Sequence, residues 1–580
     1  MESSDEQAIK DAKWADEEGI PALDEPFIQK YLDGRDALIQ QEQQQRSDHA
    51  FRTGMTPMQR GAAAIVSAIR FEEQQTLWNW SHEDNLAKQD GVTVYPGMMF
   101  LLAKERMEQS KLWKIVRKMP KGALLHCHMS ATGDLDHIFQ IALDTNDFCI
   151  SADLPLTTSE NITKAGVRFK YVRGLRSRAV TIWSDAYEAH SWNSLTKAAD
   201  AYPDDGREGF IKAMVARLTI SQEESLNHNL GVGEIWRKFT SCFRTIDSLL
   251  RYEPIFRRFI YHVLTQMNED GVRWVDFRAD FVHPFYSIEC EGADEGFSNM
   301  LNIFSQELER FKLSEEGQGF WGARIIWTGL RMFGTRGIAE DMKTAIAMKQ
   351  KFPKLIAGYD LVGPEELGRP LADLTPELFW FKKQCRDAFV DIPFYFHAGE
   401  TMGTGDEVDE NVFDAVLLGT RRIGHGFSLY KHPLLIDMVK EKKILIESCP
   451  ISNEVLRLTS SILSHPLPAL LARGVACSIS NDDPSIMGHK GSGMSHDFFQ
   501  ALQGWESLGL EGLASLAENS VRWATFDDCD SRQWQQQIKD GAYGTGVRAE
   551  RMKAWAMEFE RFCQWVVLEF GAEQDINTLD

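Results

Sequence analysis

Four short segments of the chain combine side chains that bind metal ions with side chains that transfer protons. They contribute His126 and His128, His397 and Glu400, His425, and the pair Asp482 and Asp483. Each segment ends or follows an apolar run, as expected for polar residues at the carboxyl ends of buried parallel strands. In a (β/α)8 barrel these strand ends form the active site. The pattern therefore predicts a hydrolytic metal site at one mouth of such a barrel.

The candidate metal ligands follow from side-chain type and spacing. His126 and His128 are separated by one residue, so on a strand both side chains lie on the same face and can reach one ion. His397 would add a third imidazole and Asp482 a carboxylate, a donor set that suits Zn²⁺ and leaves a position for water. Zinc held in this way lowers the pKa of its water to about 7. We therefore expect one zinc ion per chain.

The remaining polar residues fit the proton transfers that hydrolysis requires. Glu400 lies three residues beyond His397, close enough to share the pocket without binding the metal, and could shuttle protons. His425 stands between two glycines and could hold the attacking oxygen. Taken singly, an exposed loop acid and a rim histidine bonded to backbone are equal alternatives, and NDDP is also typical of an Asx turn or a helix N-cap. Only the combination of segments favours catalysis.

The order of the motifs resembles that of the adenosine deaminase family. The motifs are HCH (126–128), WVDFRAD (274–280), GYDLVGPE (358–365), HAGE (397–400), RIGHGFSL (422–429), ESCPISN (447–453) and SISNDDPSIMG (478–488). They look like the successive strand-end motifs of that family, and the resemblance extends over roughly residues 115 to 530. It implies a (β/α)8 barrel of the metal-dependent hydrolase type.

The resemblance also implies a reaction and a role for each matching residue. The reaction is hydrolytic deamination of adenosine, and of 2′-deoxyadenosine, by attack of zinc hydroxide on purine C6. The implied zinc ligands are His126, His128, His397 and Asp482. Glu400 would protonate N1, His425 would position the hydroxide, Asp483 would share a hydrogen bond with N7, and the backbone N–H of Gly363 would donate to N3.

Segments outside the catalytic core are similar to the adenosine deaminase-related growth factor branch. These are MPKGALLHCHMSA (119–131), EIWRKFTSCF (234–243) and GMSHDFFQAL (493–502). The branch has an N-terminal helical extension used for dimerisation and an insertion after the first barrel strand. We assign residues 1–110 to the extension, 111–535 to the barrel, about 143–185 to the insertion and 536–580 to C-terminal helices. A homodimer through the extension is therefore expected, and packing of the extension on its own barrel is the alternative.

The sugar end of the substrate is where this sequence departs from the family. The family has an Asp directly after HxH that binds the ribose 5′-hydroxyl, whereas this chain has Met129 and Ser130 there. Asp134 or Asp136 could substitute for it. Trp236 and Glu234 match a segment that helps to bind the ribose in the extended branch, although a core Trp beside an exposed Glu is an equal alternative. The sequence therefore does not predict which group the substrate carries at the 5′ position of its sugar.

Two other functions remain as alternatives. On the same fold the substrate could be AMP, adenine or a modified adenine nucleoside, and phosphate recognition would call for Arg or Lys near the 5′ position. The chain could also be a non-catalytic signalling protein. Presence of all four candidate ligands together with Glu400, His425 and Asp483 counts against a non-catalytic role.

Composition excludes several other classes of protein. The 580 residues carry a formal charge of −22 without a basic block, which argues against binding to nucleic acid or to an anionic membrane. Nine dispersed Cys without a CxxC pair predict buried free thiols. The acidic start lacks the apolar stretch of a signal peptide, so a cytoplasmic protein is expected.

Overall fold

The architecture was determined from a computed structural model, which describes residues 4–78, 94–175, 180–288, 292–294 and 296–572. Eight parallel strands form a central barrel: β1 (Gly122–His128), β5 (Val272–Asp280), β8 (Gly322–Leu330), β9 (Ile356–Val362), β10 (His397–Ala398), β11 (Arg422–His425), β12 (Leu445–Ser448) and β13 (Cys477–Ile479). They pair in the orders β1-β5-β8-β9 and β10-β11-β12-β13. Parallel bridges from Tyr359 to Phe394 and from Cys127 to Asp482 join the two halves. The predicted barrel is confirmed.

Helices surround the barrel and cross from strand to strand. The crossover helices are α14 (Glu253–Glu269), α15 (Ser298–Lys312), α16 (Thr335–Lys351), α17 (Thr375–Asp387), α18 (Asn411–Leu417), α19 (Pro433–Lys442), α21 (Leu467–Ala472) and α23 (Gly509–Arg522), with α20 (Pro450–Val455) and α22 (Gly493–Gly504) between them. Each amphipathic helix buries one stripe, such as Ile338, Met342, Ala345 and Ile346 of α16, the spacing of a single helix face. Strands β1 and β9 are buried throughout, as expected for strands covered on both faces.

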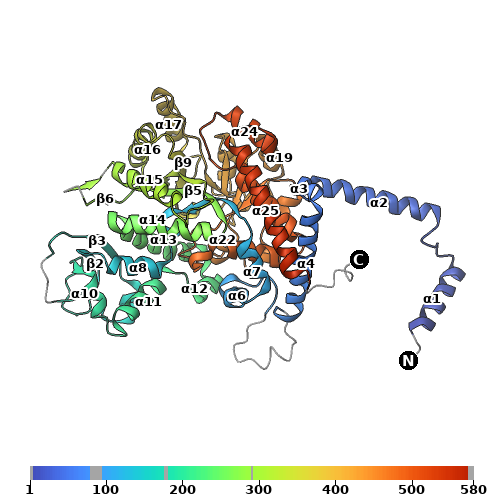
Figure 1. Cartoon of the computed structure of the whole chain (residues 1–580), viewed down its shortest axis with the longest axis horizontal. Coiled ribbons are helices and arrows are strands. Elements are labelled where there is room, and N and C mark those ends of the chain that lie inside the picture. Colours follow the sequence, from blue (N-terminus) through green and yellow to red (C-terminus); the bar gives the residue numbers. More distant parts are fainter. Residues whose placement is uncertain (1–3, 79–93, 176–179, 289–291, 295, 573–580) are drawn as a thin grey trace.

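A large segment separates the first two barrel strands. It contains α8 (Leu135–Leu143), β2 (Phe148–Ala152), α9 (Ser159–Lys164), β3 (Val167–Tyr171), β4 (Asn193–Ser194), α10 (Leu195–Asp200), α11 (Gly206–Leu218), α12 (Gln222–Leu226) and α13 (Gly231–Leu250). The three strands form an antiparallel sheet in the order β3-β2-β4. This sheet and the two-stranded hairpin of β6 (Phe285–Tyr286) and β7 (Ala293–Asp294) lie at one end of the molecule (Figure 1). Helix α13 links the inserted segment to the barrel, because it contacts both β3 of the inserted sheet and the turn after barrel strand β1.

The N-terminal helices divide into a packed and a projecting group. Helices α3 (His49–Gly54), α4 (Pro57–Thr76), α6 (Phe100–Met107) and α7 (Lys111–Lys118) pack on the body of the molecule, whereas α1 (Ser4–Glu18) and α2 (Pro26–Gln45) extend away from it (Figure 1). Thr56 caps α4 with a capping box, and Pro57 occupies its first turn. Helix α4 packs beside the C-terminal α25 (Val547–Phe570), which follows α24 (Ser531–Asp540). By contrast, α2 buries no residue.

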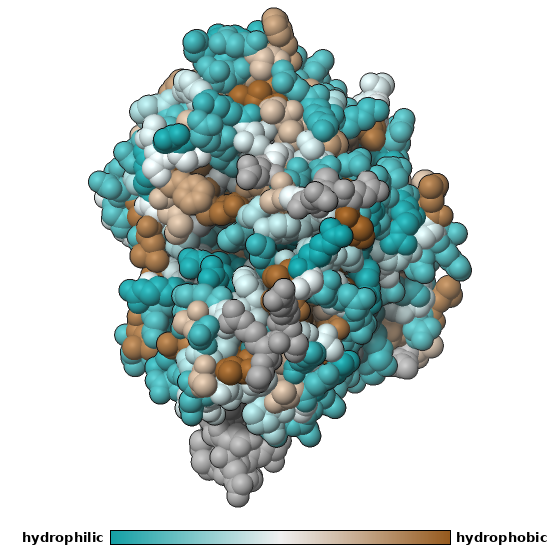
Figure 2. Space-filling view, turned by 90° about the vertical axis from the view of Figure 1, so that its left-hand side faces the viewer, coloured by the Kyte–Doolittle hydropathy of each residue, from teal (hydrophilic) through white to brown (hydrophobic). Residues whose placement is uncertain are grey.

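The surface is mostly hydrophilic on one face (Figure 2), and the described cysteines are buried. Hydrophilic residues dominate the face that carries the inserted sheet, and hydrophobic ones are scattered over it (Figure 2). Among the described residues, none of the helices has the length and apolar character needed to cross a membrane. Eight cysteines are buried free thiols, as predicted. Cys290 lies outside the described residues.

Candidate metal centre and active site

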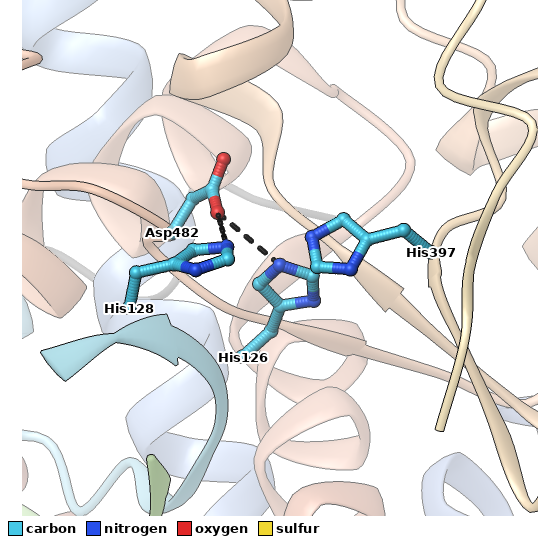
Figure 3. Close-up of side chains that lie close together, drawn as sticks. All are labelled: His126, His128, His397 and Asp482. Atoms are coloured by element: carbon cyan, nitrogen blue, oxygen red, sulfur yellow. Dashed lines mark ion pairs between the residues drawn. The ribbon is translucent and has the colours of Figure 1, made fainter. Parts of the chain in front are cut away.

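The four predicted metal ligands meet at the carboxyl end of the barrel. His126 and His128 belong to β1, His397 begins β10, and Asp482 follows β13. Their ligand atoms all lie within 4.8 Å of one another. Oδ1 of Asp482 is 3.2 Å from Nε2 of His126 and 3.4 Å from Nε2 of His128 (Figure 3). Residues separated by more than 350 positions in sequence thus present nitrogen and oxygen atoms to one point.

The chemistry of these donors fits a divalent cation. Nε2 of His126 and Oδ1 of Asp482 are buried and have no hydrogen-bond partner, which is costly unless a ligand satisfies them. Three imidazoles and one carboxylate are donors that suit zinc. A second cluster, formed by His126, His425, Cys449 and Asp482, fits less well, because burial raises the pKa of the Cys449 thiol well above its ordinary value and only a thiolate binds metal strongly.

Buried carboxylates orient two of the histidines. Nδ1 of His126 lies 2.9 Å from Glu447, and Nδ1 of His397 lies 2.6 Å from Asp360. Each imidazole therefore donates from Nδ1 and leaves the lone pair of Nε2 free for a metal. Arg278 bridges the two acids, with Nε 2.8 Å from Asp360 and Nη2 2.7 Å from Glu447. Burial alone would raise the pKa of both acids, but Arg278 and their other cationic neighbours hold each pKa well below its usual value.

Glu400 and His425 lie side by side next to the metal ligands. Nδ1 of His425 is 3.3 Å from Glu400, and its Nε2 is 3.8 Å from Asp482. Asn453 donates to Nδ1 of His425 at 3.2 Å, so Nε2 carries the proton. Burial lowers the pKa of His425 well below its ordinary value. The imidazole is therefore neutral near pH 7.

The surroundings of two carboxyl groups in the site favour their protonated form. Burial raises the pKa of Glu400 well above its usual value, and the charges of Asp482 and Glu365 add to the shift. Burial and the same Asp482 charge raise the pKa of Asp483, with a further contribution from Glu400. A buried carboxyl beside other acids is easier to keep neutral than charged. In the protonated form, Glu400 and Asp483 can act as hydrogen-bond donors.

Local backbone geometry places these side chains. His425 and Asp482 have positive φ angles of 60° and 57°, an uncommon conformation that is often found at functional sites. Glycine is required at 424, because a Cβ there would lie only 2.7 Å from Cε1 of the His126 ring. The backbone N–H groups of Gly399 and Glu400 donate to Glu365 at 3.2 and 2.9 Å and fix the loop after β10.

A cavity of about 280 Å³ opens over these residues. Its lining includes eight of the predicted site residues: His128, Trp236, Gly363, His397, Glu400, His425, Asp482 and Asp483. His126 is fully buried beneath it. Glu234 is exposed on the first turn of α13 and borders a different hollow. The structure thus brings the metal and catalytic candidates together and leaves Glu234 apart from them.

Comparison with known proteins identifies the family. The family model for adenosine deaminase matches residues 215–541. An adenosine deaminase of Lutzomyia longipalpis is 33% identical over 434 residues, which cover 74% of this chain and 78% of that protein. Human adenosine deaminase 2 is 32% identical over 457 residues, or 77% of this chain and 84% of that protein. The chain belongs to the adenosine deaminase family. It is an enzyme of the branch that contains adenosine deaminase 2.

In this deaminase-family enzyme, Asp247 lines the cavity, and it was not among the residues predicted from the sequence. Its Oδ1 accepts from Ser130, which follows the HxH motif, at 3.1 Å. Asp134 instead caps α8, accepting from the Asp136 backbone at 3.0 Å, and neither of these two acids borders the cavity. The available signal was helical spacing: Asp247 lies eleven residues after Trp236, three turns along the same face of α13.

Proposed function

We propose that the protein is a zinc-dependent aminohydrolase that converts adenosine and 2′-deoxyadenosine into inosine and 2′-deoxyinosine with release of ammonia. The observation that carries this proposal is the meeting of four candidate metal donors with the buried carboxyl groups of Glu400 and Asp483 at one cavity. Membership in the adenosine deaminase family gives the same reaction class. Relatives that bear the name adenosine deaminase support adenosine as the substrate.

Zinc, when bound by the three histidines and Asp482, supplies Lewis acidity that activates water near neutral pH. Glu400 holds its proton toward N1 of the purine, so that C6 becomes electrophilic. His425, fixed by Asn453, directs its Nε2–H at the attacking oxygen. Glu400 then carries the proton of the attacking oxygen to the amino group. The amino group leaves as ammonia, and the 6-oxopurine remains.

Hydrogen-bond donors hold two other ring nitrogens of the purine, N7 and N3. Asp483, kept protonated by burial and by Asp482, donates to N7. The backbone N–H of Gly363, where φ is +105°, donates to N3. Trp236 is buried and covers the sugar side of the cavity, and Asp247 accepts from a ribose hydroxyl. These contacts discriminate a purine from other amines because each unmatched polar group would stay buried and unpaired.

The test is the fall in ultraviolet absorbance when metal-quantified protein meets adenosine, 2′-deoxyadenosine or adenine. We expect turnover of both nucleosides, loss of turnover after chelation, and recovery with zinc. Adenine is expected to react poorly because it lacks the sugar contacts. Persistent turnover after the metal has been removed, or conversion of adenine alone, would refute the proposal.

A further inference from the structure

A second cavity of about 280 Å³ adjoins the active-site cavity on the side of α13. Five residues border both cavities: Thr240, Arg244, Met332, Gly363 and Pro364. The two cavities therefore lie directly beside each other. Gly363 contacts purine N3 in the proposed function, and N3 and the sugar-bearing N9 are both bonded to C4, so the second cavity lies on the sugar side of the bound nucleoside.

The lining of the second cavity is cationic. It contains Arg237, Arg244 and Arg331, and it includes no Asp or Glu. Arg237 and Arg244 are seven residues apart on α13 and thus share one helix face. Both are exposed, and within the part of the chain that the structure describes neither has a carboxylate within ion-pair distance. This cluster of positive charges is opposite in sign to the overall charge of −22. The overall charge by itself would repel an anion.

The third arginine, Arg331, is buried and does not use all of its hydrogen-bond donors. Its Nη2 donates to the carbonyls of Leu361 and His397 at 3.1 Å each. Nε and Nη1 have no hydrogen-bond partner, although the side chain is only 1% exposed and Glu365 lies 3.8 Å from Nη1. A buried guanidinium with unused donors is costly unless an anion or a polar ligand approaches it.

Resting on the proposed function, we propose that the second cavity is a subsite for a phosphate group carried by the sugar, so that adenosine 5′-phosphate is deaminated as well as adenosine. Arg237 and Arg244 bind the phosphate oxygens, because a planar guanidinium offers paired N–H donors to phosphate. The nearby acids Asp247 and Asp280 both pair with Arg251, at 3.0 Å from its Nε and 3.1 Å from its Nη2, so Arg251 offsets part of their negative charge. A free phosphate ion would satisfy the same donors, so the test must separate the two sources.

The experiment compares kcat/KM for adenosine 5′-phosphate with kcat/KM for adenosine, using full-length zinc-loaded protein. Arg237→Ala and Arg244→Ala should each lower the ratio of the two values by about tenfold or more, the effect of losing one charge-assisted hydrogen bond. Lys238→Ala is the matched control: it removes a cation from the same helix, but Lys238 pairs with Glu224 at 3.2 Å and borders neither cavity. Its ratio should equal that of the unmodified protein. Thermal unfolding of each variant verifies that it is folded.

A binding measurement decides the inference independently of turnover. Inosine 5′-phosphate should bind more tightly than inosine, and Arg237→Ala should abolish the difference. If adenosine is converted but its 5′-phosphate is inert, or if the ratio is the same in all variants, the phosphate subsite is refuted while the proposed function stands. If inorganic phosphate binds in an arginine-dependent way and the nucleotide gains nothing over the nucleoside, the cavity is a free-anion site and the inference is also refuted. Absence of turnover with both substrates refutes the proposed function, and the binding comparison still decides the subsite.

Discussion

Glu447 accepts a hydrogen bond from Nδ1 of His126 at 2.9 Å. The same carboxylate pairs with Arg278 and Arg422, and all four residues are fully buried. Arg422 also reaches Asp276, on β5, at 2.9 Å. A charge network inside the barrel therefore holds the metal-facing imidazole in one orientation and in one tautomer.

Replacing Glu447 by Gln should weaken metal binding by about 10- to 100-fold, because the imidazole loses its charged acceptor. It should also lower the free energy of unfolding by about 3 kcal/mol, since two buried guanidinium groups each lose one of their two charged partners. Metal content after dialysis and chemical denaturation measure the two effects. Asp528→Asn is the control, because Asp528 also pairs with two cations, Arg324 and Lys349, but is 48% exposed. Full retention of metal by Glu447→Gln would contradict the orienting role.

Substitutions at Glu400 and at Asp482 should distinguish a loss of proton transfer from a loss of metal binding. Glu400→Gln keeps the size of the side chain and removes the transferable proton, so turnover should fall by about 100-fold or more while zinc stays bound. Asp482→Ala should lose zinc, because it removes one of four donors. Atomic absorption and the absorbance assay, run on both variants, make the comparison. Near-normal turnover in Glu400→Gln would exclude Glu400 as the proton donor, and unchanged zinc in Asp482→Ala would exclude Asp482 as a ligand.

The projecting helices offer a contact between two copies of the chain. Phe27, Tyr31 and Leu38 of α2 are 61%, 69% and 67% exposed, and burial of such side chains against a partner would be favourable. Deleting residues 1–45 should therefore convert a dimer into a monomer, as measured by light scattering. This deletion spares α4, which packs beside α25. A Phe27→Glu/Tyr31→Glu variant of the full chain should behave like the deletion, and a mass unaffected by either change would refute the interface.

A stacked pair of histidines should make stability depend on pH. The ring centroids of His137 on α8 and His262 on α14 are 3.8 Å apart. Burial, assisted by repulsion from His137, lowers the pKa of His262 to about 4, although Asp134 opposes the shift. Since the unfolded chain binds a proton near pH 6.5 and the folded chain does so only near pH 4, the free energy of unfolding should fall as the pH drops between these values.

The variant His262→Phe keeps an aromatic ring in the stack and removes the titrating group. It should reduce the loss of stability between pH 6.5 and 4 by about 1 kcal/mol, a value discounted because the site is partly exposed to solvent. Urea unfolding at several pH values measures the difference. An identical pH dependence in the variant and the unmodified protein would show that another group is responsible.

The sequence by itself determined the barrel and the metal donors. Apolar runs that end in HCH, HAGE, RIGHG and NDD predicted the strands and their polar ends, because burial on both faces and period-two geometry leave a local signal. His126 and His128 could be paired from their spacing alone. Order and residue type were sufficient there, since every strand end of a barrel faces the same mouth.

The tertiary structure alone decided what surrounds those donors. Ser130 meets Asp247 from a helix 117 residues later, and Arg278 joins Asp360 to Glu447 across the barrel. It also set α2 apart from the body and placed Arg237 and Arg244 beside the active-site cavity. Such contacts leave no local pattern, because they depend on how distant elements pack and not on the periodicity of any one of them. The residues that meet at the barrel mouth were therefore predictable from the sequence, whereas the residues that surround them and shift their pKa values were not.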